Sequence, residues 1–210
     1  MIKRPYTQFA FVFLALLALA LLAALLCGFT CAPPQYELDP NHDYMEDMIA
    51  ACAAGYTAAG ERAAWARNMK IDAFHLPYDK LDFEDLYLLS KIIYAEAGSY
   101  WLSDEWKMCV GEVVLNRVAS PEFPDTIREV LEQPGQYYGK NSAYFNSLIP
   151  SERCVRLAVR ILEGERVLND ATVVFQANFK QGSGTHTMLY DRDLGYTYFC
   201  FTNYPYLYES

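Results

Sequence analysis

An acidic side chain at the end of an apolar helix is the first candidate for chemistry in this sequence. Residues 82–98 place Leu86, Leu89 and Ile93 at helical spacing, so these side chains are expected to form a buried stripe. Glu96 follows Ile93 by three residues and falls on the same face. Burial raises the pKa of a carboxyl group, and a carboxyl that stays protonated near neutrality can act as a general acid. The alternative is a carboxylate that reaches solvent from a frayed helix end.

A cysteine is the second candidate. Cys154 lies three residues after Ser151, an expected helix cap, and a helix N-terminus lowers the pKa of a thiol. His186 follows later in the chain, in the order found in cysteine peptidases that cut cell-wall stem peptides. No Asn or Asp partner for such a pair is obvious, so the carboxylate remains the favoured candidate.

The histidines and glycines argue against a metal site and a phosphate-binding site. No pair among His42, His75 and His186 has the spacing of zinc ligands, and no glycine-rich loop resembles a phosphate cradle. We therefore expect neither a metal nor a cofactor. The cysteines outside the first 32 residues leave the disulfide state open, because a chain with this much apolar sequence does not need disulfides; they are Cys52, Cys109, Cys154 and Cys200.

Composition limits the partners and the compartment. The net charge is −9, which argues against nucleic acid because phosphates require a basic patch. Lys3 and Arg4 precede an apolar run from Phe9 to Leu26, close to the ~20 residues that span a bilayer. We interpret residues 1–32 as a signal-anchor that exports the rest of the chain and tethers it to the membrane, with a cleaved signal as the alternative.

The pattern along the chain predicts an α+β fold that is mostly helical. Residues 33–79 are expected to be a linker and an accessory helical segment, with one helix or a broken pair over 44–71 interrupted near Gly55 and Gly60. Residues 80–210 are expected to form the catalytic domain. Its further helices are predicted over 103–118, 125–131 and 151–162, followed by a small hairpin of strands 172–176 and 196–201 joined across 182–184.

Several ordered motifs carry a resemblance to a known family. The sequence contains Tyr94-Ala95-Glu96-Ala97, Leu115-Asn116-Arg117-Val118, Phe123-Pro124, Pro134-Gly135-Gln136-Tyr137, Pro150-Ser151-Glu152, Val174-Phe175-Gln176-Ala177 and Tyr198-Phe199-Cys200. Over about 85–203 it resembles the spore cortex-lytic (SleB-type) cell wall hydrolase family. The chain departs from that pattern at one place, where Gly98-Ser99-Tyr100-Trp101 stands in the position at which family members often carry Arg-Gly-Glu.

The resemblance implies a lysozyme-like helical domain that cleaves the glycan strand of peptidoglycan. It places the catalytic glutamate on Glu96 and the substrate-binding residues on Gln136, Tyr137, Phe175 and Gln176. One glutamate suffices for lytic transglycosylation, whereas ordinary glycoside hydrolysis uses a second carboxylate. Glu105 and Glu112, on the helix that follows, are the acids available for that role, although Glu112 is first expected on a solvated face. A non-catalytic wall-binding domain is the remaining alternative.

Overall fold

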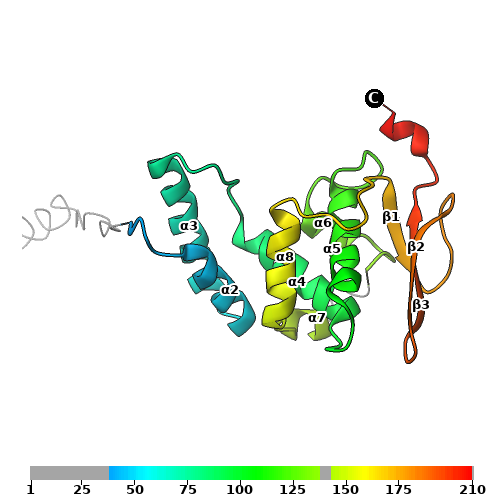
Figure 1. Ribbon diagram of the computed structural model, residues 1–210, viewed down its shortest axis with the longest axis horizontal. Coiled ribbons are helices and arrows are strands. Elements are labelled where there is room, and N and C mark those ends of the chain that lie inside the picture. The colour runs from blue at the N-terminus through cyan, green and yellow to red at the C-terminus, as the bar shows by residue number, and fades with distance from the viewer. Residues whose placement is uncertain (1–37, 138–142, 210) are drawn as a thin grey trace, which may run out of the picture. The chain divides into compact units, whose positions relative to one another are not determined.

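The computed structural model describes residues 38–137 and 143–209, and residues 39–210 form one compact unit. Helices dominate this unit, and a small antiparallel sheet follows them in the chain (Figure 1). The elements are α2 (Tyr44–Ala54), α3 (Thr57–Phe74), α4 (Phe83–Ala97), α5 (Asp104–Val118), α6 (Ile127–Glu132), α7 (Ala143–Ser147), α8 (Glu152–Leu162), β1 (Val173–Ala177), β2 (Thr185–Asp191), β3 (Gly195–Phe201) and a 3₁₀ turn (Pro205–Tyr208). The predicted α+β class, mostly helical, is confirmed.

Local capping explains where the main helices begin. Asp82 accepts a hydrogen bond from the Glu84 amide, Ser103 from the Trp106 amide and Ser151 from the Cys154 amide. Each bond satisfies one of the amides that the first turn of a helix leaves unpaired. These starts agree with the sequence prediction.

The core lies where α4, α5 and α8 pack on one another. Leu86, Leu89 and Ile93 of α4 are fully buried there, as their spacing predicts. Gly111 lies in the middle of α5, and a Cβ at this position would come within 2.9 Å of the Ile93 side chain. The missing side chain therefore lets α4 and α5 approach closely, which outweighs its low helix propensity.

The predicted break in the 44–71 segment is correct at one glycine and wrong at the other. Gly55 adopts a left-handed conformation (φ 71°) and ends α2, whereas Gly60 lies inside α3. A Cβ on Gly60 would lie about 2.0 Å from the ring of Phe83, so this glycine serves the contact between α3 and α4. Met48 and Cys52 of α2 are fully buried in the core, while Trp65 of α3 is half exposed.

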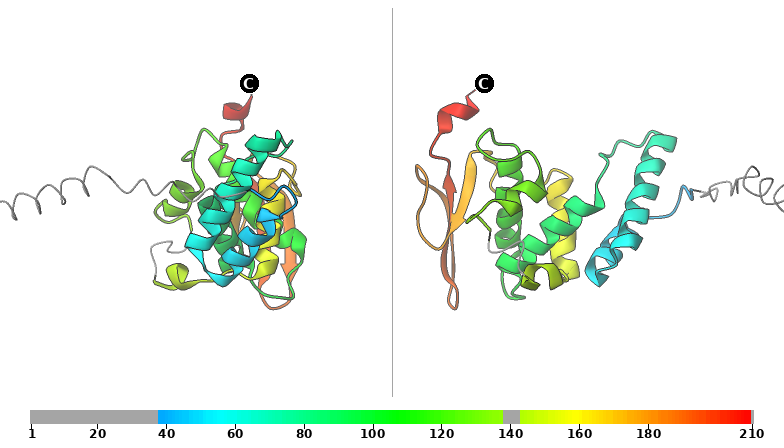
Figure 2. Two further views of the ribbon diagram at one scale, coloured as in Figure 1. Left: turned by 90° about the vertical axis from the view of Figure 1, so that its left-hand side faces the viewer. Right: turned by 180° about the vertical axis from the view of Figure 1, so that it is seen from behind.

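The C-terminal sheet has three strands rather than the predicted two. Its order is β1-β3-β2, with both pairs antiparallel, and the hairpin joins β2 to β3. β2 was not predicted because polar residues make up most of the segment and none of its side chains is fully buried. The sheet lies beside α5, at the end of the unit opposite to α2 and α3 (Figures 1 and 2).

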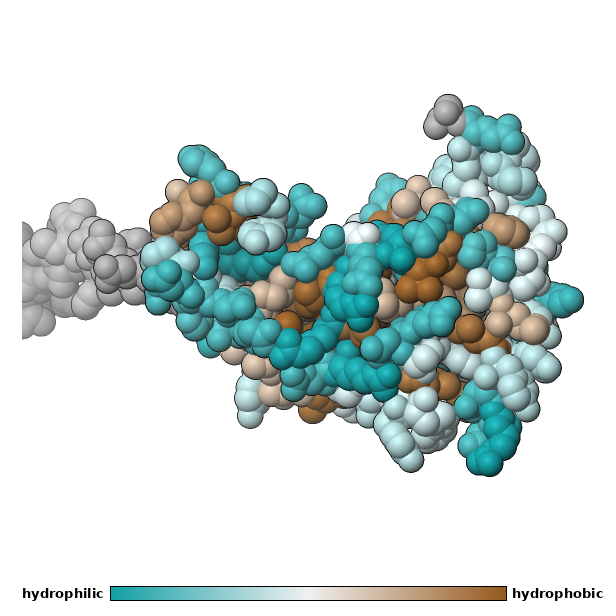
Figure 3. Space-filling view, in the orientation of Figure 1, coloured by the Kyte–Doolittle hydropathy of each residue, from teal (hydrophilic) through white to brown (hydrophobic). Residues whose placement is uncertain are grey.

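The predicted signal-anchor lies outside the described residues. Over residues 38–137 and 143–209, no helix combines the length and the apolar character needed to cross a membrane. The face seen in Figure 3 is largely hydrophilic, with apolar residues in separate patches.

Candidate active site

Glu96 lies in the last turn of α4, and its side chain is accessible to solvent. Protein nevertheless surrounds the carboxyl group closely enough for burial to raise its pKa. No neighbouring charge within the described residues contributes to this shift. The site therefore holds an accessible carboxyl group that retains its proton to a higher pH than an ordinary glutamate, as a general acid requires.

Tyr137 lies close enough to Glu96 for their charges to interact, and Arg117 lies against the Tyr137 ring. Burial raises the pKa of Tyr137, and charges on Arg117 and Glu96 act on the phenol in opposite directions, which places both groups nearby. The Arg117 guanidinium lies 4.9 Å from the centre of the Tyr137 ring and 5.0 Å from that of Phe123. The Tyr137 hydroxyl and Nη1 of Arg117 are enclosed and have no hydrogen-bond partner among the described residues. Enclosed polar groups without partners are costly, and a bound ligand can supply the missing partners.

Two residues of the Asn-Arg motif hold β1 against α5. Asn116 donates hydrogen bonds of 2.9 Å to the carbonyls of Asp170 and Val173, and Nε of Arg117 donates one of 2.7 Å to the carbonyl of Val174. These bonds fix the start of β1 beside the residues around Tyr137.

The structure separates the two residues predicted on β1. Gln176 pairs with the buried Phe199 and shares its face of the sheet, with its amide oxygen enclosed and unpartnered. Phe175 pairs with Cys200 and contacts Gly182 on the opposite face. Gln136 is exposed in the turn before Tyr137. Tyr137 is thus the predicted substrate-binding residue placed beside Glu96, and the roles of Gln136, Phe175 and Gln176 stay predictions.

Glu112 lies neither on a solvated face of α5 nor in a position to act as a second acid. Its side chain is 1% exposed, so the expectation of a solvated face is wrong. Both carboxylate oxygens accept backbone hydrogen bonds, from Val167 at 2.5 Å and from Leu168 at 2.9 Å. Glu112 therefore holds the segment after α8 in place and has no free oxygen for a substrate. Glu105 is exposed in the first turn of α5.

The cysteine candidate does not have the surroundings of a nucleophile. Cys154 is fully buried on α8, where burial shields the thiol from any substrate. His186 is exposed on β2, with its Nδ1 2.8 Å from the Thr187 hydroxyl and its ring against Phe201. No contact joins the two residues. Cys52, Cys109, Cys154 and Cys200 are free thiols, which closes the question of their pairing.

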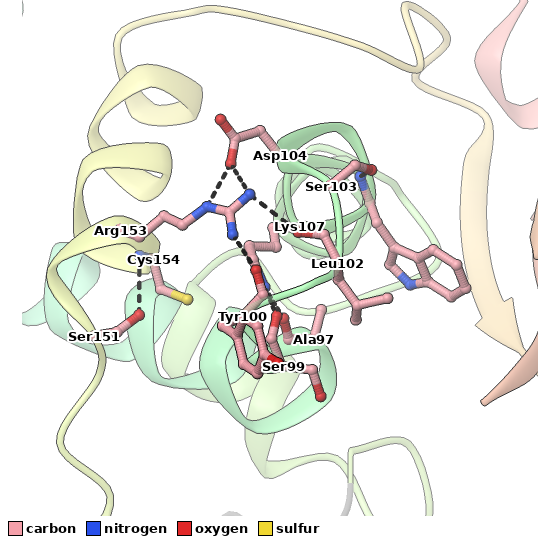
Figure 4. A network of polar contacts seen from close by, with 11 residues as sticks. Ala97, Ser99, Tyr100, Leu102, Ser103, Asp104, Lys107, Ser151, Arg153 and Cys154 are labelled. Carbon is pink, nitrogen blue, oxygen red and sulfur yellow. Dashed lines mark hydrogen bonds and ion pairs between the residues drawn. The ribbon is translucent and has the colours of Figure 1, made fainter. Parts of the chain in front are cut away.

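The turn that follows Glu96 is held by two cations (Figure 4). The buried Lys107 donates hydrogen bonds to the carbonyls of Ala97 and Ser99, the latter at 2.8 Å. Arg153 donates to the carbonyl of Tyr100 at 2.7 Å and to that of Leu102 at 3.0 Å. These bonds satisfy carbonyl groups that the end of a helix leaves unpaired and fix the end of α4 that carries Glu96.

Cavities elsewhere carry no comparable chemistry. One of about 420 Å³ lies at the start of α2 and along α3. Its polar groups already have partners: Arg67 binds the carbonyl of Asp79, Lys70 that of His42, and His42 binds Asp47. Within residues 38–137 and 143–209, no group of three His, Cys, Asp or Glu side chains is arranged to hold a metal ion.

The helical unit thus presents an accessible glutamate whose pKa is raised by burial. In the comparison with known families, residues 103–192 match the model of the Cell Wall Hydrolase family. This match supports a peptidoglycan-cleaving hydrolase. It covers α5 to β2 and leaves α4 and Glu96 outside. No curated protein and no solved structure matches the chain, so the lysozyme-like fold stays a prediction.

The sequence analysis missed two residues that organise the site. Arg117 was read only as part of a motif, and Lys107 was not singled out. Both are basic residues within a largely apolar stretch of α5. Such a pattern predicts a buried cation, which needs several acceptors nearby. The sequence alone did not reveal which acceptors these would be.

Proposed function

We propose that the protein cleaves the glycan strand of peptidoglycan between MurNAc and GlcNAc as a lytic transglycosylase, with Glu96 as the acid and then the base. The observation that carries the proposal is the accessible Glu96 carboxyl group, whose pKa is raised by burial alone. The match of residues 103–192 to cell wall hydrolases supports the choice of substrate.

The reaction needs one proton carrier. Protonated Glu96 gives its proton to the glycosidic oxygen, and the bond between this oxygen and C1 of the muramyl residue breaks. Ionised Glu96 then removes the proton from the muramyl 6-hydroxyl, whose oxygen bonds to C1. The product is a 1,6-anhydro end, Glu96 regains its proton, and no water is consumed.

A muramidase with two carboxylates is the alternative reaction. Its second acid would lie roughly 5–9.5 Å from the first. Glu112 is occupied by backbone amides, and no other described carboxylate contributes to the raised pKa of Glu96. Both observations favour the reaction with a single acid, and Glu105 is the residue left for the alternative.

The released ends distinguish these reactions. Purified peptidoglycan is digested with residues 33–210 in ¹⁸O-labelled water, and the fragments are analysed by mass spectrometry. We expect anhydro-muramyl ends without label. Reducing muramic ends that carry ¹⁸O would contradict transglycosylation and make Glu105→Gln the next variant. Binding without any release would contradict the proposed enzyme and favour a wall-binding domain.

We also propose that the protein acts outside the cytoplasm, because peptidoglycan lies there. The basic residues Lys3 and Arg4 followed by the apolar run from Phe9 to Leu26 support export with a membrane tether.

A further inference from the structure

We propose that Tyr100 and Trp101 form a carbohydrate-binding subsite next to Glu96, a rigid aromatic surface on which a pyranose ring of the glycan strand stacks. The proposal rests on the proposed function and names a contact that the family resemblance does not supply. These residues stand in Gly98-Ser99-Tyr100-Trp101, where the chain departs from the pattern of similar hydrolases.

Both rings are exposed to solvent, and Tyr100 is the most exposed of the large apolar side chains in the described residues. Tyr100 is 84% exposed and Trp101 is 50% exposed. Their rings contact each other edge to face, with centroids 5.2 Å apart and an angle of 89° between the planes. A polar side chain in either position would avoid the cost of exposing an aromatic face to water.

The backbone under these rings is fixed. Lys107 donates a hydrogen bond to the carbonyl of Ser99, the residue before Tyr100. Arg153 donates to the carbonyls of Tyr100 and Leu102 (Figure 4). Asp104 accepts a 2.7 Å hydrogen bond from Nε of Arg153 and so orients this guanidinium. Because this backbone is already held in place, binding of a ligand to the two rings costs little backbone entropy.

The side chain of Trp101 interacts with Asp191 at the end of β2. Burial acts to raise the pKa of Asp191, but hydrogen bonds from the backbone of Asp193 and Leu194 and from the Trp101 side chain bring it below its usual value. Trp101 thus connects the turn after Glu96 to the end of β2.

The chemistry of the surroundings selects a sugar. Pyranose rings have an apolar face of C–H groups that packs on aromatic rings, and Tyr and Trp provide such contact area at low entropic cost. Asp104, Glu105 and Asp191 lie around the turn, and the whole chain carries a charge of −9. This charge disfavours an anionic membrane surface and does not oppose an uncharged GlcNAc residue.

The test uses the Glu96→Gln variant, so that bound glycan is not consumed. Binding of soluble, uncrosslinked glycan strands is measured by titration calorimetry. We expect Tyr100→Ala and Trp101→Leu each to weaken binding about tenfold, equivalent to about 1.4 kcal/mol. Tyr56→Ala is the matched control, because Tyr56 is 68% exposed at the junction of α2 and α3, and we expect no change from it.

A second variant tests the role of rigidity. Arg153→Gln keeps both rings but frees the carbonyls of Tyr100 and Leu102, and we expect it to weaken binding about threefold while the melting curve stays cooperative. In the active enzyme, Tyr100→Ala should raise the KM for insoluble peptidoglycan and leave kcat nearly unchanged.

The outcomes separate this proposal from the proposed function. Release of muropeptides by the wild type, with Kd and KM unchanged in Tyr100→Ala and Trp101→Leu, would overturn the subsite and leave the enzyme intact. Loss of binding to phosphatidylglycerol vesicles without loss of glycan binding would also overturn it and assign the rings to a membrane surface. Absence of release by the wild type would contradict the enzyme alone, since the binding comparison still decides the subsite.

Discussion

At the scale of single residues, the environment of a carboxyl group decides its role. Glu96 and Glu112 both have a pKa raised by burial. Glu112 is enclosed and its oxygens bind the backbone amides of Val167 and Leu168, which partly oppose the shift. Glu96 is accessible and lies beside Tyr137. A raised pKa by itself therefore does not identify the acid, whereas access to solvent separates the two.

We predict that Glu96→Gln lowers the rate of glycan cleavage roughly a hundredfold to ten-thousandfold, the usual contribution of a general acid. Glutamine keeps the shape of the side chain but carries no transferable proton. The wild-type rate should fall as pH rises through the raised pKa, and the residual rate of the variant should not show this dependence. Muropeptide release measured across pH tests both statements. Cys154→Ser is the control and should retain wild-type activity.

Glu96→Gln should also change the pH dependence of stability, because the mutant side chain does not ionise. The pKa of Glu96 is higher in the folded chain than its ordinary value of 4.5, so folding favours the protonated form. The stability contributed by the proton is complete below pH 4.5 and is lost as pH rises through the raised pKa. Melting curves should therefore show Glu96→Gln equal to the wild type near about pH 4 and more stable than it at about pH 7.5. A difference that does not change with pH would contradict the raised pKa.

At the scale of elements, two helix contacts depend on glycines. Gly111 allows α5 to approach α4, and Gly60 allows α3 to pack on Phe83 at the start of α4. Glycine lowers the helix propensity of α5 and of α3, but it allows a close contact with α4. These contacts position α4 and therefore Glu96.

We predict that Gly60→Ala destabilises the fold by about 1–3 kcal/mol, because overpacking outweighs the gain in helix propensity of about 1 kcal/mol. The added methyl group would overlap the buried ring of Phe83. Urea denaturation measures the change. In a Phe83→Leu background the same substitution should cost less, since the obstructing ring is absent, and an equal cost in both backgrounds would show that the contact is not responsible.

At the scale of the whole molecule, α2 and α3 belong to the same compact unit as the predicted catalytic helices. Met48 and Cys52 are fully buried in the shared core, and Arg156 of α8 makes two 2.8 Å hydrogen bonds to Glu46 of α2. Exposed ion pairs contribute little stability, so the apolar contacts carry this packing. The accessory segment therefore supports α4 and α8.

Export with a membrane tether can be tested on the full chain. We predict that the protein fractionates with membranes and that residues 39–210 are digested by protease added outside intact cells, since the N-terminal run is apolar and preceded by basic residues. Immunoblotting of the fractions measures this. If all of the protein were instead recovered from the medium with its chain starting at Pro33, the segment would be a cleaved signal.

The structure also shows which kind of feature the sequence could predict. Asp82, Ser103 and Ser151 mark helix starts because a cap bonds an amide two or three residues away. The resemblance supplied Tyr137 through its motif. The missed β2 strand has alternating exposure but few apolar side chains, so its pairing with β3 depends on residues in another segment.

The helical pattern and the buried apolar stripe of α4 could be predicted from the sequence, because they depend on neighbours within one or two turns, whereas Glu96, expected on that stripe, is exposed. The tertiary structure decided which groups meet that acid. Tyr137 comes near Glu96 from a separate segment, Glu112 turns to the backbone after α8, and Lys107 holds the end of α4. Such contacts depend on the path of the whole chain, since the energy of a buried charge is set by partners that local spacing does not specify.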